Sequence, residues 1–129
     1  MNRSRTLFAC LVILTASPAA AEPCGGLAFD GGRVVSARPL RAVEKPAPVE
    51  AECLDAIGKQ LGGRASVRSI TVAVRLSDAE RAAGAGMRIG DQVKAALVRG
   101  GVPEARVSVV VPTATEGEQG TLAITFTEK

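Results

Sequence analysis

The chain has 129 residues, enough for one domain with a modest hydrophobic core and too few for two ordinary domains. It contains no histidine, so catalysis by a Ser-His triad or other His-based acid–base chemistry and His-ligated metal sites are excluded. Because tryptophan and tyrosine are also absent and the formal net charge is only +3, the composition argues against a nucleic-acid partner.

The N-terminus has the three-part pattern of a secretory signal peptide. A basic segment, Met1–Arg5, precedes an apolar run, Thr6–Ala16, and the small residues Ala19–Ala21 follow before Glu22. The apolar run is shorter than the roughly 20 residues that a membrane-spanning helix needs. We therefore expect residues 1–21 to be cleaved and the mature chain, with no transmembrane segment, to be exported to the periplasm or secreted.

Cleavage would change both the charge and the cysteine count. Arg3 and Arg5 would leave with the signal peptide, so the mature chain would carry 14 basic and 13 acidic residues. Cys24 and Cys53 would remain, and an even pair in an exported chain favours a disulfide. The chain-entropy model gives such a cross-link about 3–4 kcal/mol of stabilisation. The alternative interpretation is two unpaired thiols, with Cys53 a small core residue on a helix.

Residues 22–48 are expected to form an N-terminal leader with an edge strand. Glu22–Gly32 is rich in glycine and is predicted to be irregular. Gly32–Val43 is predicted to be extended, and Pro39 makes it an edge strand or splits it.

Residues 49–129 carry the stronger patterns and are expected to form the α/β domain. Apolar residues with helical spacing predict a first helix over Val49–Leu61; they are Val49, Cys53, Leu54, Ile57 and Leu61. Gly62 and Gly63 then end this helix.

Strict alternation over Ser66–Leu76 predicts a strand that is covered mainly on one face. That face carries Ile70, Val72, Val74 and Leu76. A loop or frayed turn is expected over Ser77–Gly86, followed by a second helix over Met87–Arg99 in which Gly90 permits close packing on the sheet. Two more strands are predicted over Val107–Val111 and Thr121–Thr127.

The predicted order of elements is β-α-β-α-β-β, which indicates a single α/β sandwich with two helices packed on one mixed sheet. The segment from Leu54 to Ser108 resembles the OmpA-like C-terminal domain family. The resemblance rests on the end of the second helix and the strand after it, where the family pattern is matched by Val93, Leu97, Gly101, Val102, Pro103, Val107 and Ser108. It covers roughly Pro39 to the C-terminus.

The resemblance implies peptidoglycan binding, because OmpA-like domains hold the diaminopimelate of the stem peptide between an aspartate and an arginine. A zwitterionic amino-acid end needs one carboxylate and one guanidinium placed close together. In this chain the family's Thr-Asp motif is replaced by Arg75–Asp78, and its Leu-Ser-x-x-Arg-Ala motif is replaced by Ala85–Gly90. Counting back from the Gly-Val-Pro junction places Ile89 at the family's arginine, with Arg88 beside it.

Asp78 and Arg88 are therefore the candidate ligand-binding residues. The alternative roles are a helix cap for Asp78 and a solvated surface position for Arg88. Two functions remain open: peptidoglycan association, or a degenerate structural or protein-interaction module of an envelope complex. Scattered carboxylates, unsuitable cysteine spacing and the lack of histidine indicate no enzyme, no metal and no cofactor.

Overall fold

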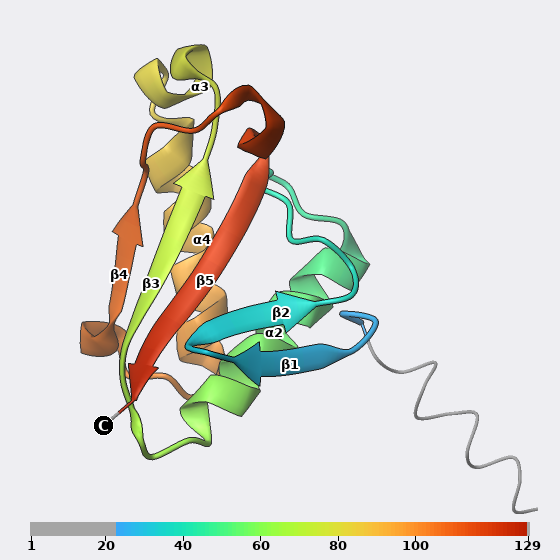
Figure 1. Ribbon diagram of the computed structural model, residues 1–129, viewed down its shortest axis with the longest axis vertical. Helices are drawn as coiled ribbons and strands as arrows, with labels where there is room; N and C mark the ends of the chain where they lie inside the picture. Colours follow the sequence, from blue (N-terminus) through green and yellow to red (C-terminus); the bar gives the residue numbers. More distant parts are fainter. Residues whose placement is uncertain (1–22, 129) are drawn as a thin grey trace, which may run out of the picture.

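The computed structural model describes residues 23–128, and the predicted signal peptide lies outside the described residues. One five-stranded mixed sheet is covered on one face by helices, and Figure 1 shows α2 and α4 behind the strands. The sheet order is β1-β2-β5-β3-β4, in which β3 and β4 are parallel and the other neighbouring pairs are antiparallel. The predicted class, an α/β sandwich on one mixed sheet, is confirmed.

The strands are β1 (Leu27–Asp30), β2 (Arg33–Ser36), β3 (Val67–Arg75), β4 (Val107–Val110) and β5 (Thr121–Glu128). The α-helices are α2 (Pro48–Gly62), α3 (Asp78–Ala82) and α4 (Ala85–Gly100), and two short 3₁₀ turns are η2 (Glu104–Arg106) and η3 (Glu116–Glu118). Of the helices in residues 23–128, none has the length and apolar character needed to span a membrane.

The core lies between the sheet and the two long helices. Alternate residues of β3 and β5 point inward because side chains alternate between the faces of a strand. The inward residues include Ile70, Val72, Val74, Leu122, Ile124 and Phe126, all of which are buried. The helices contribute a complementary apolar stripe, which includes Ile57, Leu61, Ile89, Val93 and Leu97.

The leader differs from its prediction in two respects, the first of which is a strand where an irregular segment was expected. Leu27–Asp30 forms β1, which pairs with β2 around the turn at Gly31 and Gly32. Both glycines have positive φ, 62° and 78°, the geometry that a tight two-residue hairpin turn requires. The sequence Asp-Gly-Gly-Arg is itself a hairpin signal. With β1 outside it, β2 lies within the sheet and is not an edge strand.

The second correction concerns Ser77–Gly86, where a loop or frayed turn was expected and a short helix, α3, is found over Asp78–Ala82. Ser77 Oγ accepts a hydrogen bond from the Glu80 N–H at 3.2 Å, and Glu80 Oε1 accepts one from the Ser77 N–H at 3.1 Å. This capping box supports the short helix α3. Gly84, at φ 81°, then reverses the backbone so that α4 begins at Ala85, earlier than predicted.

The predicted role of Gly90 is confirmed, because α4 packs directly on β4 at this position. A Cβ on Gly90 would overlap the Val109 side chain. The two long helices approach in a similar way, since a Cβ on Gly58 would lie 2.9 Å from Leu97 Cα and one on Gly100 would overlap the Gly58 backbone. Glycines therefore let α4 pack closely on the Val109 side chain of β4 and let the backbones of α2 and α4 touch.

Candidate functional site

Arg88 and Asp78 lie near the end of β3 where α3 and α4 begin. The segment between β2 and α2, residues 37–47, is called the connector from here on. Backbone hydrogen bonds from Leu122 N–H to Leu40 O and from Ala42 N–H to Gly120 O attach the connector to the start of β5. These bonds bring the next connector residues, including Glu44, alongside the first turn of α4.

Arg88 is bound by Glu44, which the sequence did not single out. Arg88 Nε donates to Glu44 Oε1 at 2.9 Å, and Arg88 Nη2 donates to Glu44 Oε2 at 3.3 Å. The remaining nitrogen, Nη1, donates to the Ala83 carbonyl at 3.1 Å. This is the two-pronged geometry with which a guanidinium holds a carboxylate. Each of the three guanidinium nitrogens of Arg88 therefore has a protein acceptor.

The pair shifts the two pKa values in opposite directions, each toward the charged form of its group. Hydrogen bonding from Arg88, with its positive charge, lowers the pKa of Glu44 below its ordinary value. The hydrogen bond to Glu44 and its negative charge raise the pKa of Arg88. The two side chains are 54% and 48% exposed, so solvent and salt screen their attraction. The pair consequently positions Arg88 but adds little to the stability of the fold.

Asp78 points elsewhere. Its side chain is 94% exposed and its Oδ1 lies 3.4 Å from Arg81 Nη1, one turn further along α3. A carboxylate in the first turn of a helix is favoured by the helix dipole, which accounts for Asp78 without any ligand. Within residues 23–128, no hydrogen bond or ion pair joins Asp78 to Arg88.

Ile89, the residue that sequence counting places at the family's arginine, is 3% exposed and belongs to the core. The α4 backbone therefore directs position 89 toward the sheet and position 88 toward the connector, in keeping with the roughly 100° that separates neighbouring helical residues. A shift of register that would bring Arg88 to the position of Ile89 does not occur.

No sequence signal could have identified Glu44. It lies 44 residues before Arg88 and in a proline-flanked segment without periodicity, so only the folded path of the connector brings the two together. Arg88 itself was found through the resemblance, and its side chain makes no direct contact with that of Asp78.

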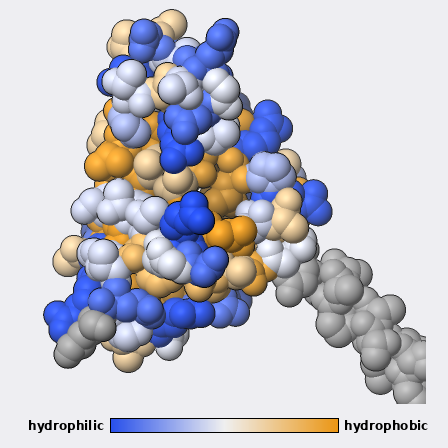
Figure 2. All heavy atoms as spheres, viewed as in Figure 1, coloured by the Kyte–Doolittle hydropathy of each residue, from blue (hydrophilic) through white to orange (hydrophobic). Residues whose placement is uncertain are grey.

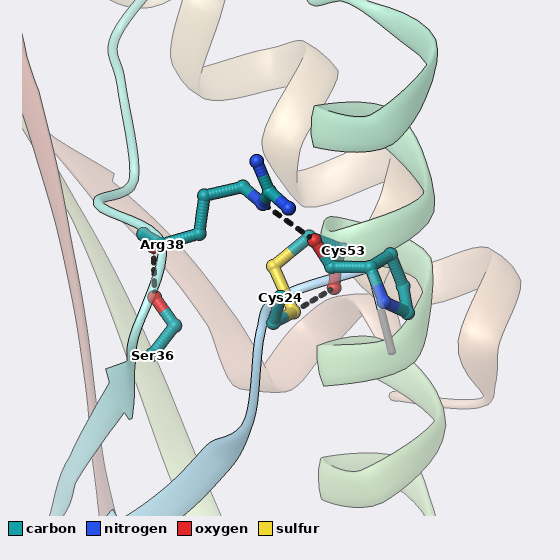
Figure 3. The surroundings of a disulfide bond; sticks show 5 residues. Cys24, Ser36, Arg38 and Cys53 are labelled. Carbon is teal, nitrogen blue, oxygen red and sulfur yellow. Dashed lines mark hydrogen bonds between the residues drawn. A yellow bond between two sulfur atoms is a disulfide. The ribbon is translucent and has the colours of Figure 1, made fainter. Parts of the chain in front are cut away.

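The other end of the connector lies beside a disulfide and is hydrogen-bonded to the residues around it. Cys24 and Cys53 are bonded, with their Cα atoms 4.8 Å apart, and both residues are buried. Figure 3 shows the disulfide joining the leader to α2, with the Arg38 side chain extended beside it. Arg38 N–H donates to Cys24 O at 2.9 Å and Arg38 Nε donates to Pro23 O at 3.0 Å. The leader, connector and α2 are therefore fixed to one another.

The chemistry open to this corner is carboxylate binding by a guanidinium. Within residues 23–128, no three His, Cys, Asp or Glu side chains are grouped so that they could hold a metal ion. The shifted pKa values of Glu44 and Arg88 move each group further into its charged form at neutral pH. Neither group is thereby prepared to exchange a proton near neutrality.

No protein-family model matches this sequence, and no curated protein matches it. The fold is nevertheless similar to a solved structure, the periplasmic domain of Helicobacter pylori MotB (residues 97–256). The match has a TM-score of 0.56 and 15% sequence identity, and it covers 81% of this chain and 87% of the MotB chain. At this identity the similarity concerns the fold, which agrees with the OmpA-like architecture expected from the sequence.

Proposed function

We propose that this chain is an exported, non-catalytic module of the cell envelope that acts as a structural element or through a protein partner. One observation carries the proposal: the Arg88 guanidinium is held by Glu44 instead of facing Asp78. A diaminopimelate site would need a free guanidinium and a carboxylate that both face one ligand. The bond from Arg88 to Glu44 and the separate position of the Asp78 side chain support the structural or protein-binding role over this one.

Three features support the envelope location. The N-terminal residues have the pattern of a signal peptide, and the disulfide between Cys24 and Cys53 suits an oxidising compartment. The fold is similar to a periplasmic domain of another protein. Fold similarity by itself does not carry function, so the location rests on the three features together.

The edge strand β4 is the surface that we propose for a protein partner. β4 has only β3 beside it, and Figure 1 shows it at the outer side of the sheet. Its sequence, Val107–Val110, carries neither proline nor charge, and Val110 is 42% exposed. An edge of this kind offers unpaired backbone groups to an added strand.

Peptidoglycan association is the second candidate, and the exposure of the ion pair favours it. Because Glu44 and Arg88 are both about half exposed, their attraction is weak and a ligand carboxylate could take the place of Glu44. In that case Glu44 would act as an internal competitor. This candidate predicts that removing the Glu44 charge increases binding to the wall.

Sedimentation with purified peptidoglycan sacculi separates the two candidates. The oxidised chain from residue 22 would be compared with Glu44→Gln, Arg88→Gln, Asp78→Asn and the control Glu116→Gln, which removes an exposed carboxylate from η3. The proposal predicts no specific sedimentation of any variant. Retention of Glu44→Gln alone, lost again on adding Arg88→Gln, would establish the second candidate. Retention of the parent, lost in Asp78→Asn and Arg88→Gln, would contradict the proposal.

Crosslinking in intact cells tests the partner. The proposal predicts a crosslinked envelope protein that is lost in Val110→Glu, which places a charge on the β4 edge. The control Thr125→Glu places the same charge at an exposed position of β5, a strand that has neighbours on both sides in the sheet. Equal crosslinking of both variants would rule out the β4 edge as the partner surface.

A further inference from the structure

A cavity of about 220 Å³ lies between the connector, the first half of α2 and the second half of α4. Its position follows from the helix packing. The two helices touch through Gly58 and Gly100, toward their C-terminal ends, and Figure 1 shows them converging there. Nearer the start of α2, the connector spans the space between them, and Leu122 of β5 lines the interior.

The wall of this cavity is mainly apolar. Its lining side chains include Leu40, Val43, Leu54, Val93, Ala96 and Leu122, of which the last four are buried. Figure 2 shows apolar surface near the middle of the visible face, bordered above and below by hydrophilic residues. A molecule with many amide groups would lose hydrogen bonds to water in such a site, whereas an alkyl chain would not. The wall therefore suits hydrocarbon better than peptide.

The charges that line the cavity are mostly positive. Three arginines, Arg38, Arg41 and Arg99, are opposed by one carboxylate, that of Glu50. Glu50 Oε1 already accepts a hydrogen bond from the Ala47 N–H at 3.0 Å, and Arg99 bonds Asp55 at 3.0 Å. Arg41 forms no side-chain hydrogen bond or ion pair with any residue from 23 to 128. Exposed guanidinium groups beside an apolar site complement an anionic head group.

The volume sets the size of the apolar part. An apolar cavity of about 150 Å³ admits benzene, whereas pockets that enclose a whole drug-sized ligand begin at about 300 Å³. This cavity falls between the two. It would accept the end of an alkyl chain and leave a charged head at the mouth.

We propose that this cavity binds a single-chain anionic amphiphile, with its alkyl chain among Leu54, Val93 and Leu122 and its head group beside Arg41. The ligand could be a free fatty acid or one chain of an anionic lipid, because the two share this chemistry. The proposal goes beyond the envelope role proposed above and does not depend on it. The cavity neighbours the Glu44–Arg88 pair without including either residue.

The first test uses sodium decanoate below its micelle concentration and records backbone amide NMR spectra of the oxidised chain. Saturable shifts are expected at Leu54, Val93 and Ala96. Ala51→Leu, which extends a lining side chain into the mouth, should abolish them, while the control Ala79→Leu on the exposed face of α3 should not. Urea unfolding would show that both variants fold. Scattered, non-saturating shifts, or equal binding by Ala51→Leu, would overturn the proposal.

The head-group contact is tested with Arg41→Gln. This variant should weaken decanoate binding by about tenfold, equivalent to loss of one charge-assisted interaction, and should leave binding of neutral decanol unchanged. Arg68→Gln, which removes an exposed guanidinium from β3, is the matched control and should change neither. Equal loss for decanoate and decanol, or no loss for either, would remove Arg41 as the head-group contact and contradict the assignment.

Flotation with phospholipid vesicles distinguishes the two sources of ligand. Binding to anionic vesicles that is absent with zwitterionic vesicles and lost in Ala51→Leu would assign a membrane lipid. Decanoate binding without vesicle binding would assign a free fatty acid. Binding to neither decanoate nor vesicles would overturn the proposal.

Discussion

The two ends of the α2–α4 helix pair are held together by different means. At the C-terminal ends the backbones touch, because Gly58 and Gly100 leave no side chain between them. At the other end the helices are bridged by the connector, which the Cys24–Cys53 disulfide and the Glu44–Arg88 pair hold in place. We call the C-terminal ends, where the backbones touch, the closed end, and the region near the start of α2, where the connector lies between the helices, the open end. The open end carries the cavity and the exposed charges. The cavity lies where the backbones of the two helices are not in contact.

The largest expected effect on stability comes from removing the disulfide at the open end. Replacing both cysteines, Cys24→Ser with Cys53→Ser, should lower the free energy of unfolding by about 3–4 kcal/mol, because the cross-link closes a long loop of the unfolded chain. Urea unfolding monitored by circular dichroism measures it, with the oxidised parent as reference. The double variant should respond no further to reducing agent. A loss below about 1 kcal/mol would mean that packing alone holds the connector.

Disturbing the backbone contact between α2 and α4 should lower the free energy of unfolding by a somewhat smaller amount. Alanine is favoured over glycine in a helix by about 1 kcal/mol, but a Cβ on Gly100 would overlap the backbone of Gly58 and Lys59. Overpacking against backbone should dominate and lower stability by about 2–3 kcal/mol in Gly100→Ala. Gly117→Ala, where a Cβ meets nothing within 4 Å, is the control. A stabilised Gly100→Ala variant would contradict the close helix contact.

A smaller effect is expected on the sheet side of α4. Gly90→Ala would press against the Val109 side chain, and we expect a net loss of about 1 kcal/mol after the gain in helix propensity. Adding Val109→Ala removes the obstructing methyl groups. The double variant should therefore be less destabilised than the sum of the two single variants. Strict additivity in urea unfolding would indicate that Gly90 and Val109 do not meet.

The smallest effect on stability is expected at the exposed ion pair. Glu44→Gln should shift the unfolding midpoint by less than Gly90→Ala does, because solvent screens the pair. The lowered pKa of Glu44 decides how the contribution of the pair to stability changes with pH. The stability that the pair contributes is fully present at pH values above the ordinary carboxyl pKa. It disappears as the pH falls through the lowered pKa that Glu44 has in the folded state. If Glu44→Gln lowered the free energy of unfolding more in acid than at neutral pH, this expectation would be contradicted.

Much of the fold was predictable because its signals are local. Alternation predicted β3 and β5, and helical spacing with Gly62 and Gly63 predicted α2 almost to its ends. The β1–β2 hairpin was missed although its Asp-Gly-Gly turn is local evidence for it. Helix α3 was missed because Gly84 and Gly86 indicated a loop, and the capping box formed by Ser77 and Glu80 was not recognised in the sequence.

The site was less predictable because its contacts are distant in sequence. Cysteine parity indicated the pairing of Cys24 with Cys53. Nothing comparable connects Glu44 with Arg88, or places the arginines of the connector beside those of α4. Such pairs are set by the path of an irregular segment, which no periodic pattern encodes.

The central claim, that Arg88 is committed to Glu44 and not to Asp78, is tested most directly by NMR titration of the side-chain carboxyl carbons. The account predicts a Glu44 pKa below the ordinary glutamate value, returning to that value in Arg88→Gln and unchanged in Asp78→Asn. An ordinary Glu44 pKa, together with an Asp78 carboxyl that shifts in Arg88→Gln, would contradict it. That result would place the two residues of the sequence prediction in one site.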